Sequence, residues 1–113
     1  MKLVTLKKRR DFVLSNNHGQ KTHNKNFILQ EYSNPNISDK GLTFGFTATK
    51  RIGNAVKRNR AKRRMKALIL SLLKEDNILF KEKYSYVLIA KQSILKASFF
   101  EMHNQLKKCL SKL

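Results

Sequence analysis

The sequence has few of the residues that form disulfides, metal sites and phosphate-binding turns. Its 113 residues include one cysteine, Cys109, so the chain can form no internal disulfide and has no cysteine cluster for zinc. A lone thiol on an apolar helical face is typical of a buried core residue. Only 4 glycines are present, and Gly53 stands apart from the others, so there is no glycine-rich phosphate loop.

Long apolar runs are missing too. No segment approaches the roughly 18 uninterrupted apolar residues of a membrane span, and the start MKLVTLKKRRDF lacks the apolar core of a signal peptide. We therefore expect a cytoplasmic protein with no membrane partner and no evident obligate protein partner. At 113 residues with 41% hydrophobic content, the chain suits one domain with one core, residues 1–113.

Acidic residues are scarce and scattered. The 7 Asp and Glu residues fall in different predicted elements, and His18, His23 and His103 have no partner at metal-ligand spacing. A self-sufficient nuclease needs clustered carboxylates for metal ions or a set of acid–base side chains. We therefore predict that this chain supplies no catalytic residue and binds no metal ion by itself.

Basic residues, in contrast, are abundant. The 25 Lys and Arg residues give a formal net charge of +18, so the folded chain repels itself and gains from a polyanionic partner. DNA, RNA and an anionic membrane surface all satisfy the charge alone. The arrangement of the charges must therefore distinguish these partners.

The hydrophobic pattern predicts a mixed α+β domain, a layered α/β sandwich in which helices cover a sheet. The order is helix, two or three strands, helix, strand, helix (αβββαβα). The predicted segments are a helix over 5–19, a short edge strand within 18–26, strands over 27–32 and 42–49, a helix over 55–73, a strand over 84–90 and a final helix that starts near Ser98.

Two helices have clear caps and apolar faces. Asn54 is a good N-cap for the helix over 55–73. Ser98 and Glu101 form a capping box for the last helix. The predicted core faces are Met65, Leu68, Ile69, Leu72 and Leu73 in the first of these helices, and Phe99, Met102, Leu106, Cys109, Leu110 and Leu113 in the second.

The segment KRIGNAVKRNRAKRR, residues 50–64, and Lys66 contain nine Lys or Arg residues and no acid. At about 100° per residue, the positions Asn59, Arg60, Arg63, Arg64 and Lys66 lie opposite the apolar stripe, and Arg58 and Lys62 lie nearer its flanks. Cations at a helix N-terminus oppose the helix dipole by roughly 0.3 to 1 kcal/mol each. The same N-terminus offers free N–H groups to phosphate, which favours a bound nucleic-acid backbone.

Two structural explanations compete with nucleic-acid binding. A solvated helical face normally mixes charge signs through i,i+4 pairs, and this stretch has no acid to pair with. An interfacial membrane helix would place aromatic residues against lipid, whereas the apolar side here is aliphatic and is needed to cover the sheet. Among nucleic-acid binders, a ribosomal-type protein, an RNA chaperone and a DNA-binding protein that reads the major groove remain alternatives.

The same segment closely resembles the signature of the protein subunit of bacterial ribonuclease P, a basic turn with Asn-Ala-Val and Arg-Asn-Arg that leads into a basic helix. LKKRRDF at residues 6–12 is similar to that family's first helix, and VLIAK at residues 87–91 to its last strand. The resemblance implies binding to a catalytic RNA and, in a cleft between the first helix and the sheet, to the 5′ leader of precursor tRNA. It further implies that the RNA cleaves the leader with Mg²⁺ held mainly by RNA, and that a left-handed connection joins parallel strands, contrary to the usual handedness.

Site residues follow from the resemblance position by position. RNA contacts, or the turn that presents them, are expected at Lys50, Arg51, Asn54, Arg58, Asn59, Arg60, Lys62 and Arg63. Phe12 is expected in the leader cleft, although a core position would also suit it. Asn16 and Gln30 stand where family members often carry further aromatics, which weakens base stacking, and Tyr32 is the candidate substitute.

Overall fold

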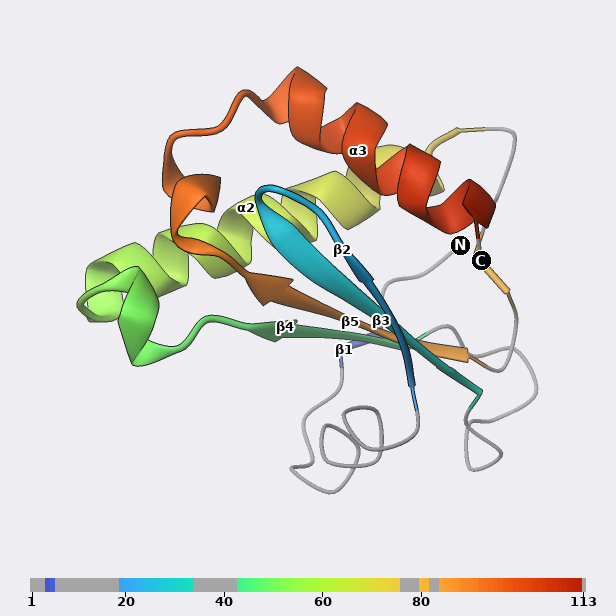
Figure 1. The fold of residues 1–113 in the computed structure, drawn as a ribbon, viewed down its shortest axis with the longest axis horizontal. Coiled ribbons are helices and arrows are strands. Elements are labelled where there is room, and N and C mark those ends of the chain that lie inside the picture. Colours follow the sequence, from blue (N-terminus) through green and yellow to red (C-terminus); the bar gives the residue numbers. More distant parts are fainter. Residues whose placement is uncertain (1–3, 6–18, 34–42, 76–79, 82–83, 113) are drawn as a thin grey trace.

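The structure is a computed structural model, and it describes residues 4–5, 19–33, 43–75, 80–81 and 84–112. A five-stranded sheet forms the centre of the described fold, with strand order β1-β4-β5-β3-β2 (Figure 1). The strands are β1 (Val4–Thr5), β2 (Gln20–His23), β3 (Phe27–Ser33), β4 (Thr43–Thr47) and β5 (Tyr84–Ala90). β5 pairs in parallel with β4 and antiparallel with β3, so the sheet is mixed.

The two faces of the sheet differ because side chains alternate along each strand. Leu29 of β3 lies opposite Leu88 of β5, and both are buried in the core. Their neighbours Ile28 and Ile89 also face each other and are only half-buried, on the opposite side of the sheet. The sheet therefore has a packed face and a second face that holds Ile28 and Ile89.

Both long helices cover the packed face (Figure 1). They are α2 (Ala55–Leu73) and α3 (Phe99–Lys112), and short 3-10 turns precede them, η1 (Lys50–Ile52) and η2 (Gln92–Leu95). Most of the stripe predicted for α2 is buried, with Met65, Leu68 and Ile69 fully inaccessible and Leu72 4% exposed. Leu73, the last predicted member, is half-buried at the end of the helix. Burial of this aliphatic stripe is the main force that holds the basic helix against the sheet.

The predicted elements are confirmed from β2 onward, and α2 has the predicted bounds of 55 and 73. Strand β4 ends at Thr47, earlier than predicted, because the chain turns into η1, where the Ile52 N–H donates to the Thr49 carbonyl at 3.0 Å. The helix predicted over 5–19 lies outside the described residues except at its ends, where Thr5 belongs to β1 and Gly19 to a bend. The prediction that this helix begins at Thr5 is therefore wrong.

Helix α3 confirms most of its predicted core face. Met102, Leu106, Cys109 and Leu110 are buried, and Cys109 is a core residue as expected. Phe99 is the exception at 41% exposed, because it is the first residue of the helix and extends past the core that Met102 closes. Leu113 lies outside the described residues.

The connection from β4 to its parallel neighbour β5 runs through α2. This is the connection for which the family resemblance implies a left-handed turn, and that handedness stays a prediction.

Candidate nucleic-acid interface

The turn before α2 fixes how the basic helix begins. Asn54 has extended backbone angles, and its Oδ1 accepts a hydrogen bond from the Lys57 N–H at 3.0 Å, which confirms it as the N-cap. Gly53 has a φ of 136°, a backbone conformation that residues other than glycine rarely adopt. A Cβ added there would also lie 2.7 Å from Lys57 Cδ. The glycine therefore lets η1 pass directly into the capped helix.

Cations occupy the outer side of this turn and of the first half of α2, a surface that we call the basic face. Lys50 and Arg51 in η1 are exposed, and Arg58 is half-buried. The remaining exposed members are Lys57, Asn59, Arg60, Lys62 and Arg63. Seven of the RNA-contact positions that the resemblance predicts therefore lie on the basic face, together with their neighbour Lys57. The eighth predicted position, Asn54, is the cap at the start of this face.

The described carboxylates lie elsewhere. Glu31 pairs with Lys81 at 3.1 Å, and Glu75 pairs with His103 and Lys107 at 2.8 and 3.0 Å. Within the described ranges, no ion pair involves a member of the basic face. The positive charge on this face is therefore balanced by no carboxylate that the structure describes.

Arg64 corrects the prediction from the helical wheel. The wheel places Arg64 on the outer side, but its guanidinium turns toward the end of η2, where Nη1 donates to the Leu95 carbonyl at 3.4 Å and Nη2 to the Ala97 carbonyl just beyond. Its Nε is buried and has no hydrogen-bond partner among the described residues. Arg64 therefore links α2 to the start of α3 and does not belong to the basic face.

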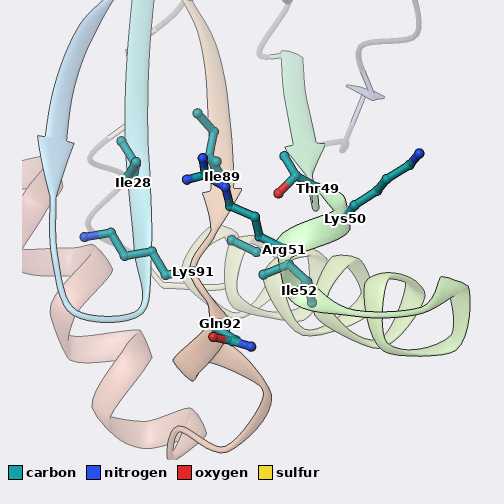
Figure 2. A pocket seen from close by; sticks show the side chains of 9 residues that line it. Ile28, Thr49, Lys50, Arg51, Ile52, Ile89, Lys91 and Gln92 are labelled. Carbon is teal, nitrogen blue, oxygen red and sulfur yellow. The ribbon is translucent and has the colours of Figure 1, made fainter.

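A hollow of about 780 Å³ opens beside η1, at one end of the second face of the sheet (Figure 2). Ile28 and Ile89 supply apolar lining, and the Arg51 side chain runs toward Ile89 in Figure 2. Lys91, on the other side of the hollow, donates from Nζ to the Asn24 carbonyl at 2.5 Å. The remaining lining residues are Thr49, Lys50, Ile52, Ala90 and Gln92. Apolar lining flanked by cations suits a base and its phosphate.

Of the four residues considered for the leader cleft in the sequence, the structure describes only Gln30 and Tyr32. Phe12 and Asn16 lie outside the described residues. Gln30 is only 2% exposed, so its amide is buried within the fold. Tyr32 is half-buried, on the same side of β3 as Ile28.

A serine, a histidine and a glutamate meet between α2 and α3. Ser71 Oγ lies 2.9 Å from His103 Nδ1, and His103 Nε2 lies 2.8 Å from Glu75 Oε1. In hydrolases the carboxylate orients Nδ1 and Nε2 takes the serine proton, whereas here the nitrogens are reversed and Ser71 donates to the Leu68 carbonyl at 2.7 Å. These contacts tie the two helices together and do not activate the hydroxyl.

The sequence did not single out Lys91 and Gln92 as site residues. Lys91 ends the VLIAK segment, and its position next to the hollow depends on the parallel pairing of β5 with β4, where Ile89 lies opposite Thr47. No local spacing rule links residues 50–51 to residues 91–92. The family-like VLIAK segment was the one signal that could have found Lys91.

The described residues include no group of three or more His, Cys, Asp or Glu side chains that could hold a metal ion. In the same part of the chain, no helix has the length and apolar character needed to cross a membrane.

Comparisons with known proteins agree on one family. The ribonuclease P family model matches residues 1–113. The ribonuclease P protein component of Nitratiruptor sp. is 35% identical over 109 residues, covering 96% of this chain and 91% of that protein. The component from Erythrobacter litoralis is 32% identical over 105 residues, covering 93% of this chain and 81% of that protein.

Solved structures show the same fold. The structure of the Staphylococcus aureus RNase P protein matches with a TM-score of 0.76 and 24% identity, covering 97% of this chain and 94% of that one. The RNase P protein from Thermotoga maritima matches with a TM-score of 0.76 and 20% identity, covering 96% of each chain.

The fold and the basic face together define a small, strongly cationic α+β protein whose charge gathers on the start of one helix. The chain belongs to the ribonuclease P protein family, the protein components of the ribonucleoprotein enzyme that cleaves tRNA precursors. The resemblance carried by residues 50–64 is therefore confirmed.

Proposed function

We propose that the basic face binds the catalytic RNA of ribonuclease P. The proposed contacts are Lys50, Arg51, Arg58, Asn59, Arg60, Lys62 and Arg63, and Asn54 shapes the turn that presents them. The observation that carries the proposal is that the cations of this face, all exposed except the half-buried Arg58, have no described carboxylate to neutralise them. Such a surface gains free energy when it displaces the counterions of an RNA backbone.

The start of α2 supports phosphate binding in a second way. The side chain of Asn54 accepts from the Lys57 N–H, so other N–H groups of the first turn are left to bind an anion. Cations near this end weaken the isolated helix, and a phosphate at the same place reverses that effect. Arginines such as Arg60 and Arg63 can bind a phosphate through two parallel hydrogen bonds.

We further propose that the hollow beside η1 is part of the path of the precursor tRNA 5′ leader. Arg51 and Lys91 supply positive charge at its edge, and Ile28 and Ile89 supply apolar surface for a base. Phe12 belongs to this path by family resemblance. Because Gln30 is buried, it contributes packing rather than base stacking.

In this proposal the protein binds and positions RNA, and the RNA subunit cleaves the leader with Mg²⁺ that RNA mainly holds. The described side chains offer no cluster that would hold the ion in the protein instead. The protein's contribution is then to raise affinity for the precursor and to lower the Mg²⁺ concentration at which the RNA works, because its cations replace part of the screening that Mg²⁺ provides.

The direct test adds the purified chain to ribonuclease P RNA at low Mg²⁺ and follows cleavage of precursor tRNA. We expect strong stimulation of 5′ leader removal, and no stimulation would reject the proposal. The chain without RNA should cleave nothing, since a self-sufficient nuclease would act alone. Competition by duplex DNA at fixed salt separates this function from major-groove recognition, which would favour a defined duplex.

Residue-level tests use Arg60→Ala and Arg63→Ala. Each should weaken RNA binding by about 1 to 3 kcal/mol and leave the free energy of unfolding nearly unchanged, because both side chains are exposed. Lys74→Ala is the matched control, since it removes one exposed charge at the other end of α2. An equal loss of binding in the control would mean that net charge, rather than the basic face, determines affinity.

A further inference from the structure

The outer face of α3 carries an aromatic side chain that RNA binding by the basic face does not use. Phe100 is 76% exposed, more than the other large apolar side chains that the structure describes as exposed. Phe100 and Asn104, one helical turn apart, both border two hollows of about 330 and 620 Å³. They therefore form a ridge with a hollow on each side. Helices pack together by placing such ridges in the grooves of a neighbouring helix.

This face differs in charge from the basic face. Glu75 and Glu101 both line it, although few carboxylates lie within the described ranges. The Ser98 hydroxyl accepts from the Glu101 N–H at 3.4 Å, and Glu101 places a negative charge in the first turn of α3. The helix N-terminus is thus already capped and opposes phosphate. These features favour a protein partner over RNA.

The charges on this face complement themselves. Lys108 follows Glu101 by two helical turns, about 10 Å along the axis and within about 20° of the same side of the helix. Both line the smaller hollow, with Gln105 between them. A two-fold axis through the middle of this hollow places Glu101 of each copy opposite Lys108 of the other. The same axis brings the exposed ring of Phe100 near Lys108 of the other copy.

We propose that α3 is a homodimer interface, in which two copies of this chain pack antiparallel about a two-fold axis near Asn104 and Gln105. We expect a contact limited to one helix face of each copy to be smaller than the roughly 1,000 Å² of a stable interface, so the dimer is weak and transient. Each copy carries +18, so raising the salt concentration from a low value should favour dimerisation by screening the repulsion between the copies. RNA binding itself has the opposite salt dependence. The inference does not depend on the proposed RNA contacts.

Sedimentation velocity of the full chain, at concentrations up to about 1 mM and at low and moderate salt, tests the proposal. We expect a monomer–dimer equilibrium that shifts toward dimer as salt rises. Phe100→Ser should weaken it about tenfold or more, because Phe100 is the main apolar contact. Glu101→Lys and Lys108→Glu should each weaken it about tenfold by placing like charges opposite each other.

Charge exchange separates an interface from a folding defect. The double variant E101K/K108E restores opposite charges across the axis, so its dissociation constant should return to within about threefold of the unmodified chain. An equimolar mixture of the two single variants should form heterodimers more tightly than either variant forms homodimers. Circular dichroism melting checks that each variant is folded.

A chain that stays monomeric at every concentration would overturn the proposal. So would single variants that dimerise as well as the unmodified chain, or a double variant that stays as weak as the singles. Photo-crosslinking from position 100 to RNA, with no crosslink to a second copy, would assign the face to RNA instead.

Discussion

The guanidinium of Arg64 donates a hydrogen bond to the backbone carbonyl oxygen of Ala97, and this bond ties the basic helix to the segment that leads into α3. Arg63, the preceding residue, is exposed on the basic face. Two adjacent arginines of one motif therefore have different roles, one in holding the fold together and one facing solvent, and substitutions can separate these roles.

Arg64→Ala should lower the free energy of unfolding by about 1 to 3 kcal/mol, because it removes a charged donor from two backbone carbonyls. Its buried Nε, which has no partner among the described residues, offsets part of that stabilisation in the native protein. Arg63→Ala is the matched control and should leave stability nearly unchanged. Urea unfolding followed by circular dichroism measures both. Unchanged stability in Arg64→Ala, with RNA affinity lost as in Arg63→Ala, would make Arg64 an RNA contact.

The cap of α2 can be separated from the phosphate site that it borders. Asn54→Ala removes the acceptor for the Lys57 N–H and should cost about 1 kcal/mol of stability. Asn54→Asp keeps an equally good cap but places a carboxylate where we propose that phosphate binds. Asn54→Asp should therefore keep its melting temperature and lose RNA affinity, measured by filter binding at fixed salt. If Asn54→Asp binds RNA as tightly as the unmodified chain, phosphate does not approach this end of the helix.

Local features of the sequence predicted the start and the core face of α2. The Asn54 cap and the Leu68 stripe depend on residues within a few turns of one another, so spacing alone locates them. Arg64 differs because the wheel gives the direction of its Cβ but not the path of its long side chain. Its partners, the carbonyls of Leu95 and Ala97, come some thirty residues later in the chain. Their position is set by the packing of η2 against α2, which periodicity does not describe.

The hollow beside η1 shows the same limit for the candidate site. Arg51 was expected from the motif, but Lys91 joins it only because β4 and β5 are parallel neighbours and end at the same edge of the sheet. The known fold of a family supplies such a strand pairing once the resemblance is recognised, whereas residue spacing within one sequence does not.

Packing of the basic helix can be tested without touching its charges. Leu68 is fully buried, so Leu68→Ala should cost about 2 to 5 kcal/mol of stability through lost burial and the cavity that remains. Leu70→Ala, two positions along the same helix, removes a side chain that is 40% exposed and should cost much less. Thermal unfolding followed by circular dichroism compares the pair. Equal losses would show that α2 contacts the core through a different face.

Glu75 gives the fold a dependence on pH that can be measured. Hydrogen bonds from Lys107 first, and from His103 second, lower the pKa of Glu75 below its ordinary value near 4.5. A carboxyl whose pKa is lower in the folded state stabilises the fold above its unfolded pKa, and this stabilisation is lost as pH falls through the folded pKa. The contribution of Glu75 should therefore be complete near neutral pH and decline from about pH 4.5 downward.

Glu75→Gln removes this titration while keeping the size of the side chain. Melting temperatures between about pH 3 and pH 7 should show the unmodified chain more stable than Glu75→Gln near neutral pH, with the difference shrinking as acid protonates Glu75. Glu101→Gln is a suitable control, because Glu101 is an exposed carboxylate on α3 that accepts from Gln105 at 3.3 Å. A difference between Glu75→Gln and the unmodified chain that stays constant down to pH 3 would mean that Lys107 and His103 do not favour the charged form of Glu75.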